Sequence, residues 1–541
     1  MEVGMSTGAG KKPLPLANIL AKWASSLTPE AIPKRVREFA VSQLASQIAA
    51  ARATMTIPIG QKIIRAFGHP LQSDPKASAY VLAALTMAID YDDTMYAGHV
   101  SHSSVAVPLA YARSSYLDGP TLLTAIVTAN ESAARITAAA TLGKFRGQTA
   151  AHTHLAASVA ARMYLEKADP TKWASAWGIA FSAPPWTLDH PFFAGESKAL
   201  TASTQIRAGL DACDAALAGM VGAADVFEHP DGFLSKYADI PLPGIITNGL
   251  GRLWHTETLS IKIYPGCAYI DSAIDCAIAI YRRELEHGHA IDPDTVDEVI
   301  VEASAFTTGM DAKSSPYIDG PNTPISAIGF SVGYNVAVAL ARGTLKASDL
   351  TPEHIGETSI WELARKVRVV HDMSLTLEAL QATAPIGEAL RHAGNSATNW
   401  LLGMAGNRLN YSNESAGRSA GAVDSISKAE QRSRRLSGNK DETPQPASPW
   451  GKPSTSFRNA TKSIGARVTV RFNDGHTEEE YRKSAIGAIG PETRSSHREL
   501  AMQKLADSGI SDKDATNLFD VESLSSKELS KLLVKLLGIP K

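Results

Sequence analysis

Residues 88–108 read AIDYDDTMYAGHVSHSSVAVP, which places a polar stretch between two apolar segments. Its polar side chains include three acids, a threonine and two histidines: Asp90, Asp92, Asp93, Thr94, His99 and His102. Acids and imidazoles held together away from water have pKa values that shift enough for proton transfer near neutral pH. A solvated loop whose acids only cap the next helix would give the same pattern, so this stretch alone leaves both interpretations open.

The length and composition of the chain exclude several classes of protein. With 541 residues the chain is long enough for two domains. Its formal net charge of −2 argues against nucleic-acid binding, which needs clustered Lys and Arg. No apolar run is long enough to span a bilayer, and the first residues lack the apolar segment of a signal peptide. We therefore expect a cytoplasmic protein that binds neither nucleic acid nor membrane.

Cofactor signatures are missing from the sequence. The three cysteines include no CxxC pair, so they predict neither a disulfide framework nor a zinc or iron–sulfur site. The sequence also lacks a P-loop, a GxGxxG after a strand, a GxSxG and an HExxH. We expect an enzyme that uses no metal and no organic cofactor.

The periodicity of the chain changes after Tyr264. Before this residue, segments such as 29–53, 119–142 and 147–165 have helical spacing and no strand is convincing. After it, four segments are predicted to be strands of a small antiparallel sheet, the last two joined by an Asn-Asp-Gly turn: 296–305, 367–371, 467–472 and 477–482. The sequence therefore predicts a mostly α protein with a smaller α/β region.

Further candidate residues lie outside the opening stretch. Lys198 stands at the predicted start of a helix, where a bound carboxylate would compensate its charge, although an exposed lysine is the plainer interpretation. Lys262 lies where the chain changes from helical to α/β, a place where clefts form. His152 and His154 lie on a helix of small residues, and Tyr334 has the pattern of a core aromatic whose hydroxyl needs a partner. This inventory fits acid–base lyase or isomerase chemistry on a small polyanion.

The order of these motifs resembles the MmgE/PrpD family, which contains 2-methylcitrate dehydratase and cis-aconitate decarboxylase. The motifs are D-Y-D-D-T, H-x-S, a helix-leading lysine, K-I-Y-P and F-S-V-G-Y. The resemblance implies a homodimer whose active site lies between a large all-helical domain and a smaller α/β lid domain. It assigns these residues to site positions: Asp90, Thr94, His102, Lys198, Lys262 and Tyr334.

The sequence departs from the family pattern at one site position. The family has Gly-x-His before the helix of small residues, whereas this chain has Gly147, Gln148 and Thr149. We expect His152 or His154 to replace the missing histidine in space, and we include His154 in the catalytic set.

We divide the chain into six parts. They are a flexible tail (1–15), a helical domain (16–262), the α/β lid (263–394), a low-complexity insertion (395–464), a lid hairpin (465–485) and C-terminal helices that return to the helical domain (486–541). The insertion is rich in Ser, Asn, Gly, Arg and Pro, so we expect that removing about Ser412–Ser456 leaves fold and activity nearly intact.

The resemblance and the residues together predict a lyase that dehydrates a citrate-like tricarboxylic acid such as 2-methylcitrate. His102 and Asp90 would transfer protons, and Thr94, Tyr334 and His154 would complete the catalytic set. Lys198 and Lys262 would hold substrate carboxylates. Three alternatives stay open: decarboxylation of cis-aconitate, epimerisation or isomerisation of a small polycarboxylate, and a binding protein without activity.

Overall fold

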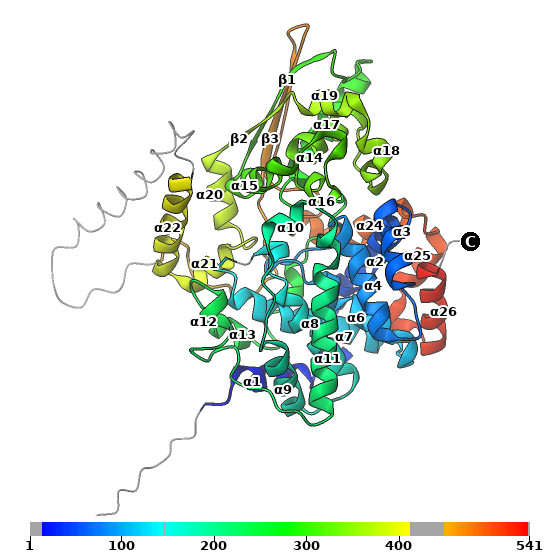
Figure 1. Ribbon diagram of the computed structural model, residues 1–541, viewed down its shortest axis with the longest axis vertical. Helices are drawn as coiled ribbons and strands as arrows, with labels where there is room; N and C mark the ends of the chain where they lie inside the picture. Colours follow the sequence, from blue (N-terminus) through cyan, green and yellow to red (C-terminus); the bar gives the residue numbers. More distant parts are fainter. Residues whose placement is uncertain (1–12, 145, 412–447, 539–541) are drawn as a thin grey trace, which may run out of the picture.

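The structure is a computed structural model that describes residues 13–144, 146–411 and 448–538. Figure 1 shows a large helical region below and a smaller region of helices and strands above it. The predicted fold class, mostly α with a small α/β part, is confirmed. Within the described residues, no helix has both the length and the apolar character that a membrane span needs.

The described residues of the helical region form thirteen α-helices before residue 250. They are α1 (Leu16–Ala24), α2 (Lys34–Met55), α3 (Pro58–Phe67), α4 (Pro75–Ala88), α5 (Ser101–Ser104), α6 (Ala106–Ser114), α7 (Gly119–Ala139), α8 (His152–Leu165), α9 (Pro170–Ala180), α10 (Asp189–Phe193), α11 (Thr201–Leu217), α12 (Phe233–Tyr237) and α13 (Gly244–Thr247). The starts of α4 and α9 follow one rule, because Asp74 and Asp169 accept backbone N–H bonds and a proline takes the first helical position.

Two helices begin later than the sequence predicts. The segment from Pro29 starts as one 3-10 turn, and α2 begins only after Pro33. A proline disfavours helical geometry at the residue before it, which separates the two pieces. The helix predicted from Gly147 begins at His152, because Gly147 adopts a left-handed φ of +58° and opens a short turn first.

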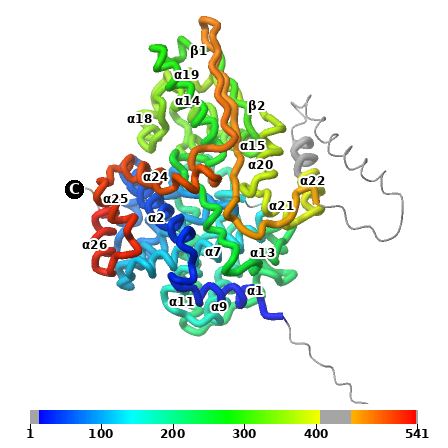
Figure 2. Tube along the Cα trace, turned by 180° about the vertical axis from the view of Figure 1, so that it is seen from behind, coloured from blue at the N-terminus to red at the C-terminus, as the bar shows by residue number. Residues whose placement is uncertain are grey.

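The upper region and the chain that follows it carry the remaining elements. They are α14 (Asp271–Glu286), β1 (Val296–Ala303), α15 (Ala305–Ser314), α16 (Ile325–Ile328), α17 (Val332–Arg342), α18 (Pro352–Ile355), α19 (Thr358–Ala364), β2 (Val367–His371), α20 (Met373–Gln381), α21 (Gly387–Ala393), α22 (Asn395–Tyr411), β3 (Ala466–Phe472), β4 (Thr477–Arg482), α24 (Pro491–Asp507), α25 (Asp512–Phe519) and α26 (Ser526–Leu537). The last three pack against α2, so the end of the chain returns to the helical region (Figure 2).

The sheet has the strand order β2-β1-β3-β4. β3 runs antiparallel to both of its neighbours, but β1 and β2 are parallel, which corrects the expectation of an antiparallel sheet. The chain between β1 and β2 contains α15–α19, and a crossover of this kind is what a parallel pair requires. The side chains of Val299, Val301, Val468 and Val470 are buried, and α14 and α17 pack against the strands and each other.

The predicted insertion is narrower than 395–464. Its first part forms α22, and residues after 447 pack on the protein. Phe457 is 1% exposed, and the Ser454 backbone N–H and hydroxyl donate to the buried Glu388 carboxylate at 2.7 and 2.6 Å. Single aromatic residues among Ser, Pro and Gly gave no periodic signal, which explains the error. Residues 412–447, including the basic cluster Arg432–Arg435, lie outside the described residues, as do residues 1–12 of the predicted tail.

Candidate active site

The C-terminal end of α4 forms one wall of the site. Asp90, two residues beyond the helix, adopts a left-handed φ of +57°, which is uncommon for a residue with a side chain. The Lys198 ammonium donates to the Met87 carbonyl at 3.0 Å, and the Lys262 ammonium donates to the carbonyls of Asp90 and Gly266. The carbonyl end of a helix attracts cations, which explains the contact of Lys198 with Met87, whereas Lys262 bonds to carbonyls just outside the helix.

Both lysines also act on the Asp90 carboxylate. Lys198 Nζ lies 3.6 Å from Asp90 Oδ2, and each of the two side chains is 1% exposed. Burial opposes ionisation of Asp90, but the charges of Lys198 and Lys262 outweigh it and lower its pKa below the ordinary value. Burial lowers the pKa of Lys198 despite the attraction of Asp90. Asp90 is therefore a carboxylate that ammonium groups keep charged.

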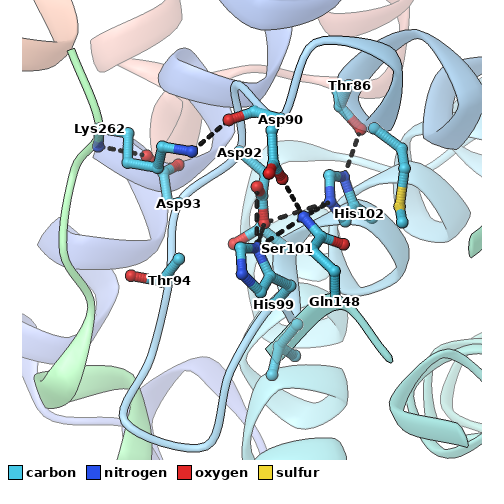
Figure 3. Close-up of polar contacts among 12 residues, drawn as sticks. Thr86, Asp90, Asp92, Asp93, Thr94, His99, Ser101, His102, Gln148 and Lys262 are labelled. Carbon is cyan, nitrogen blue, oxygen red and sulfur yellow. Dashed lines mark hydrogen bonds and ion pairs between the residues drawn. The ribbon is translucent and has the colours of Figure 1, made fainter. Parts of the chain in front are cut away.

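Asp92 connects the two histidines of the loop (Figure 3). Its carboxylate oxygens lie 3.0 and 3.1 Å from His99 Nδ1, and Oδ2 lies 3.3 Å from His102 Nε2. The other ring nitrogen of His102 bonds to Thr86 Oγ1 at 2.8 Å. Burial lowers the pKa of His102 to about 4 although Asp92 favours its charged form. His102 is thus a neutral, oriented imidazole at pH 7, as a general base must be.

Gln148 reaches into the same cluster from the turn that Gly147 opens. Its amide nitrogen donates to Asp90 Oδ1 and lies 2.9 Å from His99 Nδ1 and 3.4 Å from His102 Nε2 (Figure 3). Gln148 was missed from the sequence because only the neighbouring departure from Gly-x-His was noticed. The Gln148 side chain therefore lies among Asp90, His99 and His102, where the sequence analysis expected a histidine.

The structure distinguishes the two histidines of α8. The His154 ring centre lies 5.8 Å from that of His102, and its Nδ1 bonds to Ser103 Oγ at 2.9 Å. His152 packs instead against Phe233 and Tyr237, and its ring nitrogens have no hydrogen-bond partner in the described part of the chain. His154, which the sequence analysis chose, is the one beside His102.

Thr94 is held by Ser260 and Lys462, outside the cluster of Asp90 and His102. Its backbone pairs with Ser260, and its hydroxyl accepts a hydrogen bond from Lys462 Nζ at 3.2 Å. Next to these residues is a small recess whose lining includes Lys262, Asp271 and Lys462. Lys462 and Asp271 were not identified from the sequence, because residues far apart in the chain meet here only after folding.

Tyr334 makes its side-chain contacts with Asp349 and Trp361. Its hydroxyl donates to the Asp349 carbonyl at 3.0 Å, and its ring lies 5.0 Å from that of Trp361. Among the described residues, its hydroxyl makes no hydrogen bond to the cluster of Asp90 and His102. The same motif instead contributes Phe330, whose ring centre lies 5.8 Å from Lys198 Nζ.

Among the residues that the structure describes, two groups of side chains have donor atoms close enough for a metal ion. In the first, the donor atoms lie within 4.8 Å of one another: Asp90, Asp92, His99 and His102. The ammonium groups beside Asp90 would repel a metal ion at this cluster. The second group, on the α/β region, consists of Glu284, His289 and His476.

Comparison with known proteins follows the same division of the chain. Residues 18–241 match the MmgE/PrpD N-terminal domain, and residues 264–398 match the MmgE/PrpD C-terminal domain. Cis-aconitate decarboxylase from Aspergillus terreus is 24% identical over 385 residues, which are 65% of this chain and 77% of that protein. The cis-aconitate decarboxylase-like protein oryM from Aspergillus oryzae is 24% identical over 386 residues, 65% of this chain and 79% of its own. The chain belongs to the MmgE/PrpD family.

Proposed function

We propose that the protein is a lyase that dehydrates a citrate-like tricarboxylic acid, such as 2-methylcitrate or another alkylcitrate, and needs no metal or organic cofactor. The observation that supports this most is a buried cluster in which a neutral imidazole, His102, contacts Asp92 while Lys198 pairs with the neighbouring carboxylate of Asp90. Elimination of water from a β-hydroxy acid needs a base for the carbon proton and cations for the substrate carboxylates.

The proposed steps use these groups in turn. His102 takes a proton from the carbon next to a substrate carboxylate, and Asp92 stabilises the imidazolium that forms. Lys198 and Lys262 stabilise the negative charge that develops on that carboxylate. The C–O bond then breaks, the double bond forms, and protonated His102 returns its proton to the departing hydroxyl, which leaves as water. Asp90 sets the charge and position of both lysines, while His154 and Thr94 position the groups beside them.

A second candidate is decarboxylation of cis-aconitate, which the names of the two related proteins favour. In that reaction a C–C bond breaks and carbon dioxide leaves. The ammonium groups would stabilise the carbanion, and His102, which is neutral at rest, would take up a proton from solvent and deliver it to carbon. Return of the proton without loss of a group would make the same site an epimerase or isomerase.

One experiment separates these reactions. Purified protein in deuterated buffer is followed by proton NMR with citrate, 2-methylcitrate and cis-aconitate in separate samples. Dehydration predicts new vinylic or methyl signals from one of the two citrates without release of carbon dioxide. Decarboxylation predicts loss of carbon dioxide from cis-aconitate and a new methylene pair. Deuterium incorporation with no net product would indicate isomerase chemistry, and no change in any sample would contradict the proposal.

A further inference from the structure

The recess beside Lys262 lies where four parts of the chain meet. Ser260 and Lys262 end the helical region, Asp271 begins α14, Lys462 precedes β3, and residues 485–488 follow β4. Lys262 belongs both to this recess and to the cluster at Asp90. A molecule in the recess would therefore be next to the proposed catalytic groups.

Lys462 is a buried lysine that forms no ion pair with a described residue. Its side chain is 7% exposed, and its ammonium group donates a hydrogen bond to the neutral hydroxyl of Thr94. The ring of Tyr269 lies 5.9 Å from Nζ, and no ion pair to Lys462 exists among the residues placed by the structure. Burial lowers the pKa of Lys462 to about 8, although the nearby Asp271 favours the charged form. Burying an ammonium group with so little compensation is costly, which points to an anionic ligand.

A second buried lysine shows what a purely structural arrangement looks like here. The Lys504 ammonium donates to Ser46 Oγ and to the Tyr91 carbonyl, both at 2.8 Å, and lies 3.9 Å from the centre of the Tyr91 ring. Lys504 does not line the recess. Burial lowers the pKa of both lysines to about 8, but Lys504 has two hydrogen bonds within the protein, whereas Lys462 has one and lines the recess.

Asp271 makes the recess compatible with an anion. Its side chain is 4% exposed, and Oδ1 has no hydrogen-bond partner in the described part of the chain. Burial raises the pKa of Asp271 to about 7, against the attraction of Lys262 and Lys462. Asp271 can therefore be protonated near neutral pH, and the protonated group would donate a hydrogen bond instead of repelling a carboxylate.

We propose that Lys462, together with Thr94 and Lys262, forms a subsite that binds one carboxylate of the substrate. This inference rests on the proposed function, because it takes the ligand to be a polycarboxylate. It assigns three ammonium groups, Lys198, Lys262 and Lys462, to a molecule with three carboxylates. The subsite would favour tricarboxylates over dicarboxylates, since a dicarboxylate leaves Lys462 buried without a counterion.

The test measures binding without catalysis. Isothermal titration calorimetry compares tricarballylate, which has three carboxylates and no hydroxyl, with glutarate, which has two. The wild-type protein should bind tricarballylate more tightly. Lys462→Met should weaken tricarballylate binding by about 10- to 100-fold, as expected for loss of a charged hydrogen bond, and change glutarate binding little. The control is Lys452→Met, which removes an exposed lysine of the same segment and should change neither affinity.

The outcomes distinguish this inference from the proposed function. Equal weakening of both ligands, or unchanged tricarballylate binding in Lys462→Met, would overturn the subsite while leaving the polycarboxylate site standing. A wild-type protein that binds neither ligand would overturn the proposed function and the subsite with it. If Lys462→Met does not fold, Lys462→Gln keeps a polar group of similar length, and the same ligand difference is expected.

Discussion

Protonation of His152 should make the protein less stable in acid. The imidazole is buried against Phe233 and Tyr237, with ring-centre distances of 4.8 and 5.8 Å. Burial lowers its pKa from 6.5 to about 3. Between these pH values the unfolded chain binds a proton that the folded protein does not, so stability falls as the pH falls. At pH 5 this difference costs about 2 kcal/mol of unfolding free energy, and at pH 8 it costs almost nothing.

The variant His152→Met removes this proton and keeps an apolar side chain of similar size. Urea unfolding of the variant and the wild type is measured at pH 8 and pH 5. The unfolding free energy of the variant relative to the wild type should increase by about 2 kcal/mol from pH 8 to pH 5, because only the wild type loses stability through this group. A difference that does not change with pH would refute the placement of a neutral, buried imidazole at His152.

Three further predictions follow from the structure and the sequence. Ser454→Ala should lower the unfolding free energy by about 1 kcal/mol, measured by urea unfolding, because the buried Glu388 loses a donor; no loss would show that residues after 447 do not pack as described. Activity should survive exhaustive EDTA treatment and desalting, since the proposed chemistry uses only side chains; loss that zinc or iron reverses would contradict this. Light scattering at micromolar concentration should give twice the chain mass of 57.4 kDa, and a single-chain mass would remove the proposed homodimer.

The regular elements of the α/β region were largely predictable from local pattern. Local pattern predicted β2 at its observed bounds, and the Asn-Asp-Gly turn predicted β4 at its observed bounds and joined the last two strands correctly. The parallel pairing of β1 and β2 was not predictable from either strand, because it depends on how the chain between them crosses the sheet. Local pattern therefore predicted where the strands lie in the sequence but not which strands pair in parallel.

The candidate site, too, was only partly predictable from local sequence pattern. Asp90, His102, Lys198 and Lys262 were identified from sequence, and the structure brings them together through the end of α4 and the loop after it. Gln148 and Lys462 were missed, since Gln148 stands at the variable position of the altered Gly-x-His pattern, Lys462 lies in no motif, and each reaches the site only through tertiary packing. His99, which the family resemblance did not assign to the site, bonds to Asp92. Tyr334 shows a further limit, because a motif match does not reveal which partner its hydroxyl takes.

In the proposed reaction, His102 is the group that transfers the proton. The most direct test compares kcat for His102→Gln with kcat for His152→Met, a matched change at a buried histidine outside the cluster. Rates are measured by proton NMR on the substrate that the wild type converts, and circular dichroism checks that both variants are folded.

His102→Gln should lower kcat by about 100-fold or more, the usual contribution of general acid–base catalysis, with little change in KM. His152→Met should stay within about twofold of the wild-type kcat, since its ring packs against Phe233 and Tyr237 and forms no hydrogen bond to a described residue. A folded His102→Gln variant that keeps wild-type kcat would show that His102 is not the proton-transfer group, whatever the substrate proves to be.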